Sequence, residues 1–185
     1  GEAARVPQVA AEQVGGPAKP SATARALHSV AARFAWDAKD LIVQFDASGV
    51  FRRPVTARRG IRQSDNLWLN LTLDDLFGLK LPKDAEKQFL VAFGFPAASG
   101  PMPVAVHRPR LEAEQVKTIR AEVEGRGGRR TVRVRVPWKL LQLAPPKGAA
   151  RLGVNFGLTC WPAKGTSAWT LSWAQGGRGY VLLTT

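Results

Sequence analysis

Arginine is the residue type with the clearest chemical potential in this chain, because five arginines crowd residues 52–62. So many like charges repel one another unless an anionic group neutralises them. Guanidinium groups bind carboxylate and sulfate through paired hydrogen bonds. The segment therefore predicts contact with an acidic or sulfated glycan, a lipopolysaccharide headgroup or nucleic acid. The candidate contacts are Arg52, Arg53, Arg58, Arg59 and Arg62.

Charge is unbalanced along the whole chain, with 27 Lys and Arg against 14 Asp and Glu and a net charge of +13. A second basic group, Arg126, Arg129 and Arg130, lies in a Gly-rich turn and is best interpreted as a solvated loop. Arg108 and Arg110 flank a proline. Nucleic acid is the least favoured partner, because no nucleic-acid-reading motif accompanies the charge.

The residues that most often carry catalysis are sparse. The two histidines, His28 and His107, lie far apart and in no metal-binding spacing. No nucleophile elbow or phosphate-binding glycine loop is present in the sequence. Cys160 is the only cysteine, so neither an intrachain disulfide nor a cysteine-built metal site can form. These observations predict a protein that is not an enzyme.

Composition bounds the architecture. The 185 residues suffice for about one domain, and 45% hydrophobic with 22% charged residues is close to globular averages. A wholly disordered, collagen-like or coiled-coil chain is excluded. No apolar run approaches the ~20 residues of a membrane-spanning helix.

Apolar residues alternate with polar ones along most of the chain, as in strands with one buried face. The strand candidates are residues 31–36, 41–45, 67–73, 89–95, 132–136, 152–158, 169–173 and 180–183. Helical candidates are weaker, at 111–120 with short turns at 73–79 and 139–143. Seven or eight strands without amphipathic helices predict an all-β antiparallel two-sheet sandwich or barrel, with residues 29–185 as the domain. Residues 1–28 are expected to form an extended tail or linker that packs on the fold.

Three local patterns together resemble family-9 carbohydrate-binding modules. They are Ala35-Trp36-Asp37-Ala38-Lys39-Asp40-Leu41 between two strands, Ser64-Asp65-Asn66-Leu67-Trp68 before a long strand, and Val136-Pro137-Trp138 ahead of Leu152-Gly153-Val154-Asn155-Phe156. The closing Trp169-Thr170-Leu171-Ser172-Trp173 is also similar to the last strands of that family. Related sugar- and heme-binding domains of the DOMON type share parts of the pattern.

The resemblance implies a jelly-roll-like sandwich in a secreted, periplasmic or cell-surface protein, beside other domains of a larger parent. It implies non-catalytic sugar binding between tryptophan rings. Aromatic faces suit the flat C–H faces of pyranoses, while hydroxyls need oriented polar partners. The expected ligand is a carbohydrate or anionic polysaccharide. An alternative is a structural or interaction module that docks a partner protein or anionic surface through its Arg-rich loops.

The six tryptophans divide by position. Trp36 and Trp138 are expected to be structural, and Trp173 is expected to pack. Trp68 has the opposite phase to four leucines, so it either caps the sandwich or faces a ligand. The stacking candidates are Trp161, Trp169 and Trp68, with Arg133, Arg135, Asn70 and Asn155 as polar partners on the face away from the core.

Two cofactors follow from the resemblance. Structural calcium is possible, although calcium takes six to eight oxygen ligands and the acidic residues are scattered, with Asp74-Asp75 as the one acidic doublet. Heme is less favoured. It would need axial ligands such as Met102 with His107, and loop prolines separate these two residues.

Overall fold

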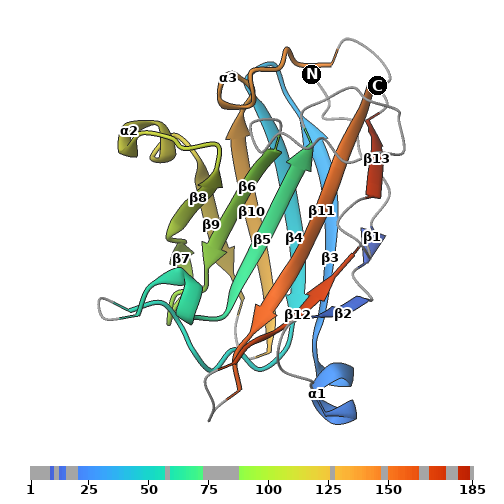
Figure 1. Ribbon diagram of the computed structural model, residues 1–185, viewed down its shortest axis with the longest axis vertical. Helices are drawn as coiled ribbons and strands as arrows, with labels where there is room; N and C mark the ends of the chain where they lie inside the picture. The colour runs from blue at the N-terminus through green and yellow to red at the C-terminus, as the bar shows by residue number, and fades with distance from the viewer. Residues whose placement is uncertain are drawn as a thin grey trace.

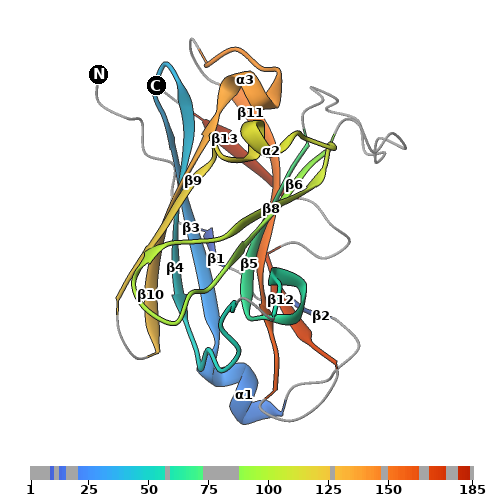
Figure 2. The same cartoon turned by 90° about the vertical axis from the view of Figure 1, so that its left-hand side faces the viewer.

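Two antiparallel sheets pack face to face in the computed structural model (Figures 1 and 2). The structure describes residues 9–10, 13–15, 21–56, 59–72, 88–125, 128–146, 150–162, 167–173 and 179–183. In Figure 1 strands β5 and β11 pass in front of β4 and β10, and Figure 2 shows the two layers from the side. The fold is an all-β sandwich with only short helices, as the alternation predicts.

The first sheet, sheet A, has six strands in the order β1 (Val9–Ala10), β3 (Ser29–Trp36), β4 (Asp40–Ser48), β10 (Arg129–Pro137), β9 (Arg120–Glu124) and β7 (Gly100–Pro101). The second, sheet B, follows the order β2 (Gln13–Gly15), β12 (Trp169–Ser172), β11 (Ala150–Cys160), β5 (Asn66–Thr72), β6 (Gln88–Gly94) and β8 (Val104–Arg108). Strand β13 (Gly179–Leu183) pairs with the first half of β11. Several neighbours are consecutive strands, such as β3–β4 and β5–β6, whereas the β4–β10 and β5–β11 pairings join segments that are distant in sequence.

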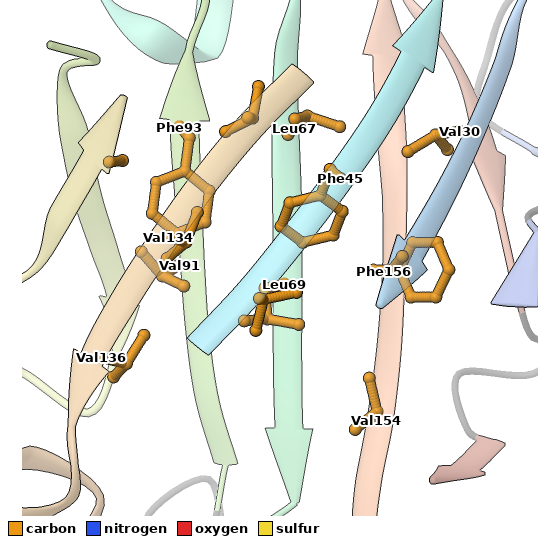
Figure 3. Close-up of a cluster of buried hydrophobic side chains, with 14 of the residues drawn as sticks. Val30, Phe45, Leu67, Leu69, Val91, Phe93, Val134, Val136, Val154 and Phe156 are labelled. Atoms are coloured by element: carbon orange, nitrogen blue, oxygen red, sulfur yellow. The ribbon is translucent and has the colours of Figure 1, made fainter. Parts of the chain in front are cut away.

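The space between the sheets is filled by the apolar half of each alternating strand (Figure 3). Phe45 of β4 and Val134 of β10 project from sheet A, and Leu69 of β5 and Phe156 of β11 project from sheet B. All four side chains are fully buried. Since side chains alternate along a strand, the other half of each sequence faces outward and is free to carry polar groups.

The turn between β3 and β4 contacts the short helix α3 (Trp138–Leu141), which follows β10 in the chain. Oδ1 of Asp37 accepts from the backbone N–H groups of Lys39 and Asp40, each at 2.8 Å. Trp138 donates its indole N–H to the Asp37 carbonyl at 3.0 Å. Trp36 and Trp138 are 8% and 4% exposed, so both are structural, as predicted.

The eight strands expected from the alternation all exist, with ends that differ by a few residues. The helix expected at 111–120 is shorter, because α2 covers only Ala113–Val116 and the chain enters β9 at Arg120. The expected turn at 139–143 overlaps α3, and the one at 73–79 lies outside the described residues.

Several short elements were not predicted. β7 contains Pro101 and β8 begins after Pro103, prolines that suggested a loop, and the small Ala121 hid the alternation of β9. Within the segment expected to be a tail, β1 pairs with β3, β2 pairs with β12, and α1 (Ala22–Leu27) precedes β3. Across the described residues, no helix is long and apolar enough to cross a membrane.

Candidate binding site

A pocket of about 490 Å³ opens on the outer face of sheet B. Its size is within the range of small-molecule sites. Four neighbouring strands, β11, β5, β6 and β8, provide the floor, and the 3-10 turn η1 (Ile61–Gln63) forms one side. The lining residues are Ile61, Arg62, Asn66, Trp68, Asn70, Leu90, Ala92, His107, Asn155 and Thr159.

Trp68 provides the aromatic surface of the pocket. It is half-buried and stands directly opposite Gly157 in the β5–β11 pairing. A Cβ atom built on Gly157 would lie 2.5 Å from Cζ2 of Trp68 and 2.2 Å from the carbonyl oxygen of Leu171. Because no side chain occupies that position, the indole lies close against the sheet.

Amide side chains supply the polar part of the floor. Asn70 and Asn155 are direct cross-strand partners, and Asn155 is only 5% exposed. Oδ1 of Asn70 is buried, and no described residue donates a hydrogen bond to it. Asn66 differs, because its Nδ2 already donates to the carbonyls of Ile61 and Ser64. Asn70 lines the pocket, and its unpaired oxygen has an acceptor capacity that the described part of the fold does not use.

Arg62 and His107 line the pocket together. Nη2 of Arg62 lies 3.3 Å from Nδ1 of His107. Desolvation, followed by the positive charge of Arg62, lowers the pKa of His107 below its ordinary value of 6.5. The imidazole is therefore neutral at neutral pH, and Arg62 carries the formal charge of the pair.

Asp65 anchors the connection that leads into this side of the pocket. Its carboxylate is fully buried and accepts from the backbone N–H groups of Arg53 at 2.7 Å and Trp161 at 2.8 Å. Burial raises the pKa of Asp65 although these hydrogen bonds oppose the shift. Burial, with the nearby Asp65 charge, also raises the pKa of the Cys160 thiol. One carboxylate thus ties the 52–62 connection to the end of β11.

The structure brings four of the sequence candidates together in this pocket: Trp68, Asn70, Asn155 and Arg62. The first three were expected as ligand contacts and the last as an anion contact. The sequence allows two alternatives for Trp68, and its outward position in a pocket favours the ligand-facing one.

Trp161 and Trp169 are not among the lining residues. The guanidinium carbon of Arg53 lies 5.2 Å from the centre of the Trp161 ring, so a cation covers that ring. Trp169 is 5% exposed and packs edge-on against His28 at 5.1 Å. Trp173 stacks on the buried Phe156 at 5.7 Å, in the packing role expected of it.

Arg133 and Arg135 lie on the other sheet, in β10. Each reaches a carboxylate at 2.9 Å, Arg133 that of Glu124 and Arg135 that of Asp37. They therefore line the outer face of sheet A, opposite the pocket. Their outward phase was predicted correctly, but phase does not tell which sheet a strand joins.

The other described arginines of the 52–62 connection do not join Arg62 in the pocket. Arg52 is exposed and Arg59 is half-buried, and neither lines the pocket. Arg58 lies outside the described residues, as do Arg126 and the Asp74-Asp75 doublet.

Sequence reasoning missed several lining residues: Ile61, Asn66, Leu90, Ala92, His107 and Thr159. The period of two that places Trp68 and Asn70 outward also places Asn66 outward, and the phase of Asn155 extends to Thr159. No comparable signal was available for His107, because β8 was not predicted.

Metal ligands do not gather in the described part of the chain, where no three His, Cys, Asp or Glu side chains form a possible metal site. Met102 is buried in the core whereas His107 lines the outer pocket. The structure does not bring these two side chains into one cavity.

Comparison with known proteins shows which solved structures share this architecture. No family model matches the sequence, and no curated protein matches it. A family-9 carbohydrate-binding module from Caldicellulosiruptor kristjanssonii in complex with cellotriose has a TM-score of 0.61 at 11% identity, covering 91% of this chain and 72% of that one. The family-9 module from that organism in complex with glucose has a TM-score of 0.56 at 12% identity, covering 90% and 74%.

A candidate carbohydrate-binding protein from Bacteroides uniformis gives a TM-score of 0.56 at 11% identity, covering 91% of this chain and 77% of that one. At these identities the likenesses establish the fold. The chain is a β-sandwich with the fold of family-9 carbohydrate-binding modules, which confirms the resemblance carried by its local patterns.

Proposed function

We propose that the chain is a non-catalytic carbohydrate-binding module, and that the pocket on the outer face of sheet B holds the sugar. The observation that carries the proposal is the pairing of Trp68, set against Gly157, with the unpartnered Oδ1 of Asn70 in one pocket. An aromatic face and oriented amide groups are the two elements that a pyranose requires. Sugar-bound structures with the same fold support the proposal.

In this proposal Trp68 packs against the C–H face of the sugar ring. Asn70 accepts from a hydroxyl, and Asn155 and Thr159 border the same floor. Trp161 is not assigned a direct contact with the sugar in this proposal. The Arg53 guanidinium covers its ring, and its backbone N–H donates to Asp65. Location in a secreted, periplasmic or surface protein, beside other domains, belongs to the same proposal.

The direct test is calorimetric titration with glucose and cellotriose, together with a glycan array. Trp68→Ala is expected to weaken binding about tenfold or more, since an aromatic contact contributes on the order of 1 kcal/mol beyond the area it buries. Trp68→Phe should recover part of that loss. Leu27→Ala is the control, because it removes an exposed apolar side chain, 54% accessible, from α1.

Two results would contradict the proposal. The first is the absence of any glycan binding at millimolar concentration. The second is affinity for every polyanion that disappears at about 0.5 M salt, since exposed charges are then screened. The second result would favour the alternative, a basic module that docks an anionic surface through its Arg-rich loops.

A further inference from the structure

The pocket contains one formal charge, and it is positive. Arg62 is the only Lys, Arg, Asp or Glu among the lining residues. Within the described part of the chain, no carboxylate forms an ion pair with Arg62. Arg133 and Arg135 on sheet A, in contrast, each have a carboxylate at 2.9 Å. Among the described residues, the guanidinium that borders the pocket therefore has no counter-charge of the kind found on the other sheet.

The contact with His107 leaves most of the donor capacity of Arg62 unused. A guanidinium has five N–H donors and no acceptor, so Nδ1 of His107 must accept at the 3.3 Å contact. The single proton of the neutral ring is then on Nε2, which makes His107 a second donor. Arg62 and His107 together form a donor-rich, positively charged side of a pocket whose floor carries Trp68.

We infer that the pocket takes a pyranose that carries an anionic substituent, a carboxylate or a sulfate, and that Arg62 is the residue that selects it. The inference rests on the proposed function and specifies its ligand class. A guanidinium matches both groups through paired hydrogen bonds, which are stronger than neutral ones. Trp68 and Arg62 line the same pocket, so one sugar can stack on the indole while its anionic group meets the guanidinium.

The surrounding charge favours the same class of ligand. Arg52 is exposed on the connection that carries Arg62, and the whole chain has a net charge of +13. A positive field concentrates anionic ligands near the protein and raises their rate of association, but it does not distinguish one anion from another. The selection itself must therefore depend on a residue inside the pocket, and Arg62 is the residue positioned to provide it.

The experiment compares one neutral sugar with two sugars that carry an anionic group at C6. Methyl β-D-glucuronide, glucose 6-sulfate and methyl β-D-glucoside are titrated into the unaltered protein and into Arg62→Gln, Arg62→Lys and Arg110→Gln. We expect at least one anionic sugar to bind about tenfold more tightly than the glucoside, as an added charged hydrogen-bonded contact allows. Arg62→Gln should remove this preference, so that the anionic sugars bind no more tightly than the glucoside, and Arg62→Lys should keep part of it.

Arg110→Gln is the matched control, because it removes the same charge from an exposed position outside the pocket. The preference should survive it. The affinities of the two anionic sugars show whether the pocket prefers a carboxylate or a sulfate. Equal affinity for all three sugars, or a preference that survives Arg62→Gln, would overturn the inference. The proposed function would still stand if Trp68→Ala weakens sugar binding as expected. Failure of every sugar to bind the unaltered protein would overturn both.

Discussion

Trp68 occupies the space that a side chain at Gly157 would need, and the two residues face each other across β5 and β11. A Cβ at position 157 would meet the indole at 2.5 Å and the Leu171 carbonyl oxygen at 2.2 Å. The pocket therefore depends on a missing side chain as much as on the aromatic one. Glycine here permits close approach of a ring and a backbone to the sheet.

Gly157→Ala is expected to lower the free energy of unfolding by about 1 to 3 kcal/mol, in the range for overpacked sites, and to displace the indole. Sugar affinity should fall with it. Gly60→Ala is the matched control, since nothing lies within 4 Å of a Cβ built there and the substitution should change stability by less than about 0.5 kcal/mol. Urea denaturation with sugar titration measures both, and equal effects of the two variants would refute the role of Gly157.

Asn70→Leu should separate binding from stability. Oδ1 of Asn70 is buried without a described donor, and an unsatisfied buried polar atom is destabilising by about 1 to 3 kcal/mol. Leucine removes that atom, so the melting temperature is expected to hold or rise while sugar binding is lost. Asn66→Leu provides the contrast, because its amide hydrogen bonds to Ile61 and Ser64 are satisfied in the fold and their loss should be destabilising. Retained sugar affinity in Asn70→Leu would count against the proposed site.

Asp65→Asn should change how stability depends on pH. Burial raises the pKa of Asp65 in the folded protein above its ordinary value of 3.8. The folded state therefore holds this proton more tightly, and the associated stability is complete below the unfolded pKa and is lost as pH rises through the folded pKa. Asparagine does not titrate, so this component should vanish from denaturation curves measured across acid and neutral pH.

The Asp65→Asn variant should also be less stable overall, by about 1 to 3 kcal/mol, because an amide NH₂ would face the backbone N–H of Arg53 or Trp161. Asp46→Asn, at a half-buried carboxylate on sheet A, is the comparison for loss of one acidic group. An unchanged pH profile in Asp65→Asn would show that Asp65 does not contribute to this dependence.

Asp37 is expected to make stability depend on pH in the opposite direction from Asp65. Desolvation favours the neutral acid, but hydrogen bonds from Lys39, Asp40 and Arg135 outweigh it and lower the pKa of Asp37 below 3.8. Its contribution to stability is present above the unfolded pKa and is lost as pH falls through the folded pKa. Asp37→Ala should cost about 1 to 2 kcal/mol at neutral pH, since the turn between β3 and β4 loses two backbone contacts.

Asp37→Asn keeps an acceptor for those two N–H groups and should lose less stability than Asp37→Ala. It should nevertheless lose the acid-side dependence, because the amide cannot titrate. Chemical denaturation at several pH values distinguishes the two effects. Sugar affinity should be unchanged in both variants, since Asp37 lies at the end of sheet A and not in the pocket.

Period-two alternation in the sequence determined the strands and the face of each residue. Trp68 and Asn70 could be placed outward because Leu67, Leu69 and Leu71 require the core, and the same reasoning places Arg133 and Arg135 outward between buried valines. The position of the turn at Asp37 was also readable, because it lies between two alternating segments, but its hydrogen bonds with Lys39 and Trp138 came from the structure.

Only the tertiary structure decided which outward faces meet. Arg133 and Trp68 have equivalent phases in their own strands, yet β10 pairs with β4 in one sheet and β5 pairs with β11 in the other. Alternation fixes the orientation of a side chain relative to its own strand, whereas strand pairing depends on contacts between residues far apart in sequence. For that reason Arg62, His107 and Asn155, which are distant along the chain, share one pocket, while Arg133 faces the opposite side of the sandwich.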